Sequence, residues 1–152
     1  MTFQEIPFQR APMPLLLEAD PSEQCIQSYL KDSWCFAAFE GEEIVGICFV
    51  KPENDTTAEL FNIAVAPDIQ AKGIGTQLLK FTLHALSNKG IEKVELGTGS
   101  FGHQLAFYQR QGFRVDSVRK NFFLDHYDEP IFEMGIQHKD MLRLVCDLSL
   151  WQ

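Results

Sequence analysis

The stretch that decides the fold is TAELFNIAVAPDIQAKGIGT, residues 57–76. Its first nine residues are mostly apolar, which predicts a strand over Thr57–Val65 in the middle of a sheet. Residues 67–68, a proline followed by an aspartate, end that strand. A loop containing Gly73 and Gly75 follows and opens into a new apolar pattern. The stretch therefore predicts a strand, a glycine-containing loop and the start of a helix.

The apolar pattern after the loop has helical spacing. It continues to Leu86, and Asn88–Gly90 closes the helix. Lys93–Leu96 is then expected to be a short strand. Strand, helix and strand in this order imply two parallel strands joined by a right-handed crossover. This pair lies inside a mixed sheet.

The remaining elements flank this unit on both sides. Further strands are expected at Phe3–Phe8, Trp34–Glu40, Ile44–Val50, Phe113–Val118 and Leu142–Leu148, and further helices at Met13–Leu17, at Pro21–Leu30 and on the stripe of Phe101, Leu105 and Tyr108. The hairpins make an α/β sandwich more consistent with the pattern than a doubly wound fold. No repeat or Gly/Ser linker divides the chain, so residues 1–152 are expected to form a single domain.

Composition narrows the function classes. The formal charge of −8 argues against a nucleic-acid partner and weakly favours a cationic substrate. The four cysteines and four histidines show no ligand spacing, so no metal is expected. No apolar run approaches a membrane span and the N-terminus lacks a signal pattern, which predicts a cytoplasmic protein that contacts no membrane. Apolar residues at 148–151 would suit contact with a second copy, a homodimer.

The loop Gln70–Thr76 is the strongest chemical signal. It lies between a strand and a helix, where unpaired backbone N–H groups and the helix dipole favour an anion. Gly73 and Gly75 allow the backbone to approach a ligand, and a phosphate, preferably a pyrophosphate, fits best. The spacing matches neither a Walker loop nor a dinucleotide fingerprint. Taken alone, two glycines easing the turn into a helix would also explain it.

The wider pattern resembles a known family. LFNIAVAPDIQAKGIG, residues 60–75, is similar to the GNAT acetyltransferase signature of an apolar strand, V-x-P and Q/R-x-x-G-x-G/A. Phe107-Tyr108 and Gly112-Phe113 resemble the same family's F/L-Y-x-x-x-G-F. The motifs cover about residues 59–113, and the order of elements agrees along nearly the whole chain. The resemblance implies a GNAT-like fold: a mixed, mostly antiparallel twisted sheet with a central parallel strand pair and helices on both faces.

The resemblance also implies a reaction, the direct transfer of an acetyl group from acetyl-CoA to an amine. Loop amides would hold the coenzyme A pyrophosphate, and the edge of the preceding strand would pair with pantetheine. The residues expected to bind acetyl-CoA are Ile63, Ala64, Val65, Gln70, Ala71, Lys72, Gly73, Ile74, Gly75, Thr76 and Ser100. Ser100 occupies a region where the family often has an asparagine, and Gln104 replaces a common alanine, which puts the pantetheine contact on that side in doubt.

Two residues are candidates for the proton transfers. Tyr108 matches the family's motif tyrosine and is the expected acid beside the coenzyme sulfur; the alternative is a core tyrosine. Glu59 is the candidate base, because strand alternation places it on one face with Phe61, Ile63 and Val65, an apolar row. A solvated carboxylate at the strand end is an equal alternative. His126 is a rival base.

Residues 125–129, DHYDE, are unusually acidic for a connector and have phenylalanines around them. Carboxylates and aromatic faces suit a cation, so His126, Tyr127, Asp128 and Glu129 are expected to bind a small-molecule amine. A solvated loop that packs its aromatic rings on the sheet is at least as good an interpretation. Two other functions stay open: a non-catalytic sensor or interaction module that binds acyl-CoA, and a binding protein for another phosphorylated ligand.

Overall fold

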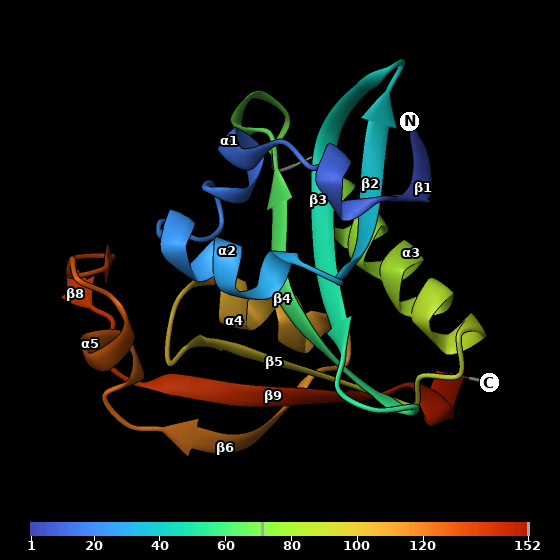
Figure 1. The fold of residues 1–152 in the computed structure, drawn as a ribbon. Helices are drawn as coiled ribbons and strands as arrows, with labels where there is room; N and C mark the ends of the chain where they lie inside the picture. The colour runs from blue at the N-terminus through green and yellow to red at the C-terminus, as the bar shows by residue number, and fades with distance from the viewer. Residues whose placement is uncertain (71, 152) are drawn as a thin grey trace. The chain divides into compact units, whose positions relative to one another are not determined.

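A computed structural model describes residues 1–70 and 72–151. The chain divides into two compact units, Met1–Glu92 and the remainder from Lys93. The expectation of a single domain stays a prediction. Each unit is built around its own antiparallel strands (Figure 1).

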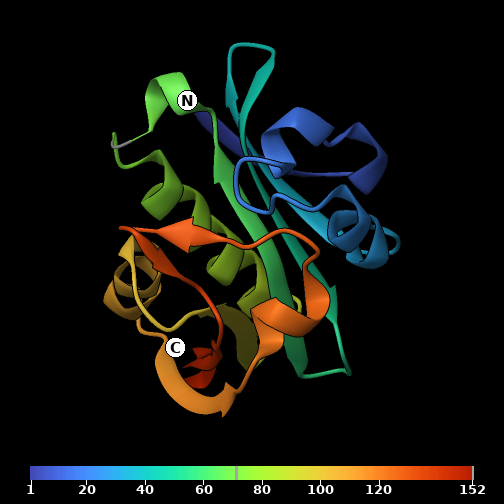
Figure 2. The same ribbon diagram turned by 90° about the vertical axis from the view of Figure 1, so that its left-hand side faces the viewer.

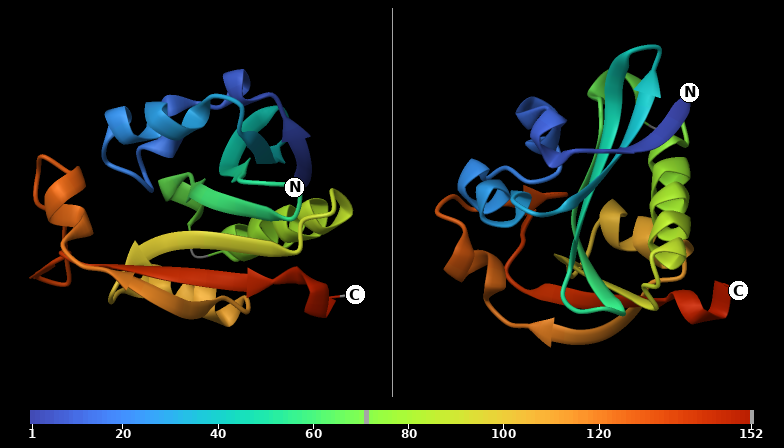
Figure 3. Two further views of the ribbon diagram at one scale, coloured as in Figure 1. Left: turned by 60° about the horizontal axis from the view of Figure 1, so that its bottom comes forward. Right: turned by 45° about the vertical axis from the view of Figure 1, so that its right-hand side comes forward.

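The first unit contains the antiparallel sheet β1-β2-β3-β4. Its strands are β1 (Thr2–Ile6), β2 (Trp34–Glu40), β3 (Glu43–Pro52) and β4 (Thr57–Val65), and its helices are α1 (Met13–Leu16), α2 (Glu23–Leu30) and α3 (Ile74–Asn88), with short 3₁₀ turns at Phe8–Arg10 and Pro67–Ile69. Helices α1 and α2 cover one face of the sheet and α3 covers the other (Figure 3, right). The sheet of this unit is therefore buried on both faces, which explains its long apolar strands.

Packing identifies which side chains face which helices. On the side of α1 and α2, Leu16, Ile26 and Tyr29 share a core cluster with Ile47 and Phe49 of β3. On the other side, Phe36 of β2 meets Phe81 of α3 edge to face, with ring centroids 6.3 Å apart. Alternate residues of β2 and β3 thus serve the two faces.

The second unit contains the antiparallel order β5-β9-β6. Its elements are β5 (Lys93–Gly99), α4 (His103–Arg110), β6 (Arg114–Arg119), α5 (Phe122–His126), β7 (Phe132–Glu133), β8 (Ile136–Gln137), β9 (Met141–Asp147) and a 3₁₀ turn at Leu148–Trp151. Figure 3, left, shows β9 in red between β5 and β6. Figure 2 shows α5, in orange, following β6 along the chain.

Most predicted elements are present, with shifted ends. The first strand stops at Ile6 instead of Phe8, because Pro7 leads into a 3₁₀ turn. The second helix begins at Glu23, since Ser22 is its N-cap and accepts a hydrogen bond from the Cys25 amide at 3.1 Å.

The segment between β6 and β9 contains regular secondary structure. It contains α5 and the hairpin β7–β8, neither of which was predicted from the sequence. The hairpin turns at Met134 and Gly135, which both have positive φ, 56° and 76°. Such a turn normally carries asparagine or aspartate before the glycine, and the methionine conceals it.

Candidate active site

The predicted phosphate loop joins β4 to α3 in the first unit. Gly73 is the N-cap of α3, with φ of 80°, a left-handed conformation that disfavours any other residue. A Cβ atom at this position would meet no atom within 4 Å. The first amides of the helix, at Ile74, Gly75 and Thr76, have no helical acceptor because none exists one turn earlier. The helix start thus offers amides and open space, which suit an anion.

The other described residues of the loop differ in exposure and contacts. Gln70 is exposed, and its Nε2 donates to the carbonyl of Val65 at 2.9 Å, which ties the loop to the end of β4. Lys72 is exposed, whereas Ile74 is buried beneath the helix start. Ala71, also expected to bind the coenzyme, lies outside the described residues.

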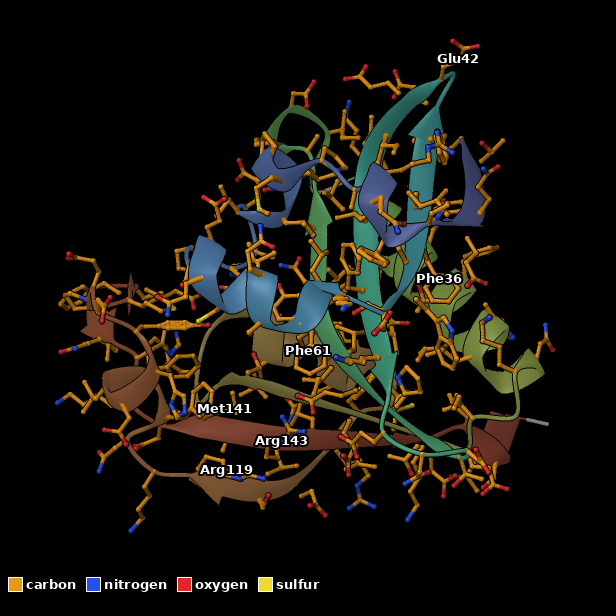
Figure 4. All side chains as sticks on the ribbon, viewed as in Figure 1. Phe36, Glu42, Phe61, Arg119, Met141 and Arg143 are labelled. Carbon is orange, nitrogen blue, oxygen red and sulfur yellow. The ribbon has the colours of Figure 1, made fainter. Side chains whose placement is uncertain are left out.

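Strand β4 contains a bulge. Val50 of β3 pairs with Leu60 and Phe49 pairs with Asn62, so Phe61 is an extra residue in β4. Phe61 lies against α2, where its ring stacks on Tyr29 with centroids 4.8 Å apart (labelled in Figure 4). Asn62 is on the same side, because its Nδ2 donates to the Tyr29 hydroxyl at 2.8 Å. Two successive side chains therefore point to one face.

The bulge corrects an expectation about Glu59. Sequence alternation placed Glu59 on one face with Phe61, Ile63 and Val65, and for the last two this is wrong. Ile63 pairs with Cys48, which pairs with Phe36 on the α3 side. Val65 shares that side by alternation, while Glu59 and Phe61 face α2. Glu59 is half-buried on the α2 face. Its role as a base stays a prediction.

Tyr108 is buried in the second unit, 6% exposed, on α4. Its ring meets Phe107 and Phe113 edge to face, with centroids 5.3 and 5.7 Å away. The Phe113 amide donates to the Tyr108 carbonyl at 3.2 Å, which closes the helix. Ser100, the other coenzyme candidate of this unit, is exposed in the turn between β5 and α4.

The predicted acceptor residues lie at the end of α5 and after it. His126 is exposed, stacks on Phe122 with centroids 4.2 Å apart, and donates from Nδ1 to the Phe122 carbonyl at 3.0 Å. That tautomer leaves Nε2 as the basic nitrogen. Tyr127 is half-buried, with its ring 5.8 Å from that of Phe123. Asp128 and Glu129 are exposed.

A cluster that sequence reasoning missed lies in the same unit. Glu133 accepts a hydrogen bond from Nε2 of His138 at 2.9 Å and another from the amide of His103 at 3.2 Å. His103 is thirty residues from Glu133 in sequence, whereas His138 is five residues from it across the unpredicted hairpin, which brings Glu133 to the start of α4. No sequence signal pointed to this contact.

Burial makes two of the thiols poor nucleophiles. All four cysteines are free, and three are buried. Burial raises the pKa of the Cys48 thiol to about 12 and that of Cys146 to about 11. Because the thiolate is the reactive form, these two residues are unsuited to forming an acyl-enzyme. This agrees with direct transfer between two bound substrates.

In residues 1–70 and 72–151, no group of His, Cys, Asp or Glu side chains is arranged to hold a metal ion. Within the same part of the chain, no helix combines the length and the apolar character needed to cross a membrane.

A strand, a glycine-containing loop and a helix whose first amides lack helical acceptors form an arrangement that suits a phosphate-bearing ligand. Comparison with known proteins identifies the family. Residues 31–115 match the acetyltransferase (GNAT) domain. YvbK of Bacillus subtilis (strain 168), an uncharacterized N-acetyltransferase, is 43% identical over 135 residues, which cover 88% of this chain and 87% of YvbK.

Two solved structures superpose on the chain. The IAA acetyltransferase from Bacillus cereus ATCC 14579 has a TM-score of 0.90 and 39% identity, covering 97% of this chain and 99% of its own. A GNAT family acetyltransferase from Elizabethkingia anophelis, with acetyl-CoA bound, has a TM-score of 0.90 and 42% identity, covering 97% of each chain. The protein belongs to the GNAT acetyltransferase family and is an acyltransferase. The predicted GNAT-like mixed α/β fold is thereby confirmed.

Proposed function

We propose that this enzyme transfers the acetyl group of acetyl-CoA to the amine of a small molecule. The observation that carries the proposal is the start of α3, where Gly73 is the N-cap and the amides of the first turn would bind a pyrophosphate. The Elizabethkingia relative, of closely similar structure, was crystallised with acetyl-CoA. The main-chain edge of Ile63–Val65 would pair with the pantetheine arm, as a strand pairs with its neighbour.

Two side chains would move protons. An alkyl amine has a pKa near ~10 and arrives protonated, so it must lose a proton before it attacks the thioester. Glu59, on the α2 face, would accept that proton directly or through water. Tyr108 would donate its hydroxyl proton to the departing coenzyme A thiolate. Each transfer would contribute roughly 10²–10⁴ in rate.

The acceptor would be a cation. Asp128 and Glu129 are exposed and adjacent, Tyr127 supplies an aromatic face, and the chain has a net charge of −8. These features would attract an ammonium group and would not hold an anion. We place the reaction in the cytoplasm, because four free thiols suit a reducing compartment. The enzyme would form a homodimer, and its mass in solution tests this.

The test is a screen of amines with acetyl-CoA. Release of free coenzyme A should rise only with certain cationic amines, and mass spectrometry should show one acetyl group on the acceptor. Acetyl-CoA that binds but is not consumed with any amine would favour the alternative, a sensor that binds acyl-CoA. If acetyl-CoA were consumed only with anionic acceptors, the protein would still be an acetyltransferase, but the acidic segment 125–129 would not bind the acceptor.

A further inference from the structure

The carboxylate of Glu133 lies at the centre of a hydrogen-bonded cluster. Its Oε1 accepts from Nε2 of His138 at 2.9 Å. Its Oε2 accepts from the backbone amide of His103 at 3.2 Å and lies 3.0 Å from Nδ1 of the same histidine. Glu133 belongs to β7, His103 is the first residue of α4, and His138 follows β8. These three residues are called the carboxylate clamp below.

The turn that receives the clamp is shaped for it. A Cβ added to Gly99 would lie 2.3 Å from Cε1 of His138, and one added to Gly102 would lie 2.4 Å from Oε1 of Glu133. Both distances are shorter than van der Waals contact, so a side chain at either position would displace the ring of His138 or the carboxylate of Glu133, and Gly102 also has a φ of 107° that favours glycine. The His138 ring is 7% exposed and stacks on Phe101, with centroids 4.1 Å apart and planes 11° from parallel. The clamp therefore packs closely against the turn that follows β5.

Electrostatics favours the same arrangement. The hydrogen bond from His138 is the main cause that lowers the pKa of Glu133, and the bonds from His103 add to it. Glu133 is therefore an anion at neutral pH. An anion at the amide of the first residue of α4 also interacts favourably with the helix dipole. The clamp thus stabilises the beginning of α4 in one position.

The location of the clamp connects two parts of the proposed site within this unit. The turn Gly99–Gly102 contains Ser100, the candidate contact for pantetheine. Tyr108 follows His103 by five residues on the same helix, about 7.5 Å along its axis at 1.5 Å per residue. Glu133 itself comes four residues after Glu129, at the end of the acidic segment. Glu133 therefore contacts the helix that contains Tyr108 at its first residue, His103.

We propose that Glu133 is a positioning residue for acetyl transfer, which through the carboxylate clamp holds the first turn of α4, and with it Tyr108, in the orientation that the reaction needs. On this proposal Glu133 acts through α4 and contacts neither substrate. This inference rests on the proposed function, since it assigns Glu133 a task in that reaction.

Three substitutions test the proposal by kinetics. Glu133→Gln should lower kcat about ten-fold or more and leave the dissociation constant of acetyl-CoA within about two-fold, because the phosphate loop belongs to the first unit. His138→Gln keeps a donor near the position of Nε2 and should retain most of kcat, whereas His138→Leu should not. Glu42→Gln is the matched control: this exposed carboxylate lies at the turn between β2 and β3 (Figure 4), and kcat should not change.

A structural readout separates this inference from the proposed function. With histidine labelled by ¹⁵N, the parent should show one slowly exchanging imidazole N–H, from Nε2 of His138, and Glu133→Ala, which leaves this N–H without an acceptor, should lose it. If the parent acetylates no amine, the proposed function fails, and this spectrum still reports whether the clamp exists. A parent without that resonance would overturn the clamp.

The kinetic proposal is overturned if folded Glu133→Gln retains the parent's kcat. It is also overturned if kcat and acetyl-CoA affinity fall together with the melting temperature, which would indicate a merely structural role. Should Glu133→Gln not fold, His103→Ala replaces it, because that side chain is 85% exposed and its removal leaves no cavity; the variant removes the contact from Nδ1 to Glu133 and keeps the hydrogen bond from the backbone amide. A fall of kcat by about two-fold or more with unchanged acetyl-CoA affinity would support the proposal, and an unchanged kcat would refute it.

Discussion

The rings of Tyr29 and Phe61 stack almost parallel, 11° apart in plane and 4.8 Å apart at their centroids. The contact joins α2 to the bulged residue of β4. The hydroxyl of Tyr29 continues the link, because it accepts a hydrogen bond from Nδ2 of Asn62 at 2.8 Å. A second bond from the same Nδ2, to the carbonyl of Leu16 at 3.1 Å, extends it to the end of α1. Both short helices are thereby attached to the strand at its bulge.

Tyr29→Phe should keep the stack and remove the hydrogen bond. The expected loss is about 1 kcal/mol of unfolding free energy, measured in urea. Burial holds the pKa of Tyr29 well above its ordinary value of 10.0, so the unfolded chain loses the proton first. The parent should therefore lose stability as pH rises above about 10, and the variant should lose less. Parallel pH curves for the two proteins would contradict this account.

Gly75→Glu should abolish the rise in melting temperature that acetyl-CoA causes, since it puts a side chain and a charge beside the first amides of α3. In the parent, a ligand at ~100 times its dissociation constant adds about 2.7 kcal/mol. Lys80→Gln, an exposed change on the same helix with the same effect on net charge, is the control. A folded Gly75→Glu protein that acetyl-CoA stabilises normally would show that the pyrophosphate lies elsewhere.

Tyr108→Phe removes only the hydroxyl from a buried ring that keeps its contacts with Phe107 and Phe113. Turnover should fall about ten-fold or more, with little change in acetyl-CoA affinity, because the hydroxyl acts on the leaving thiolate. Steady-state kinetics and a binding titration measure the two effects. Equal turnover in both proteins would return Tyr108 to a purely packing role.

Glu59→Gln tests the base. Near neutral pH the variant should lose most of its activity, since the carboxamide cannot accept a proton from the ammonium group. In alkaline buffer part of the activity should return, because more of the amine is already deprotonated. The measurement is kcat/KM against pH. A loss of the same size at every pH would assign Glu59 to substrate positioning, and no loss would remove it from the mechanism.

Asp128→Asn combined with Glu129→Gln should raise KM for a cationic acceptor and leave kcat almost unchanged. Both carboxylates are exposed, where the screening length at physiological salt is ~8 Å, so their attraction is weak. Added salt should raise the parent's KM in the same way and should affect the variant less. If salt acts equally on both proteins, these acids do not meet the acceptor.

The sequence predicted the elements whose local pattern agrees with their tertiary setting. Trp34–Glu40 and Thr57–Val65 have the predicted bounds, since an apolar run between turn residues is sufficient for a buried strand. The faces of β4 were not predictable, because the extra residue at Phe61 arises from pairing with β3. The carboxylate clamp was not predictable either, since its partners meet only after the hairpin at Met134 has formed.

The bulge at Phe61 divides β4 into two parts whose side chains can change independently in evolution. Residues 59 and 61 lie on the α2 face of β4, where the proposed base is, whereas residues 63 and 65, whose main chain is proposed to pair with pantetheine, have their side chains on the other face. On these proposed roles, a substitution at residue 59 or 61 would alter acceptor binding without changing the main-chain contact of residues 63–65 with acetyl-CoA. Insertions or deletions are different, because losing one residue here would exchange the two faces. In related proteins we therefore expect substitutions in β4 but no insertions or deletions.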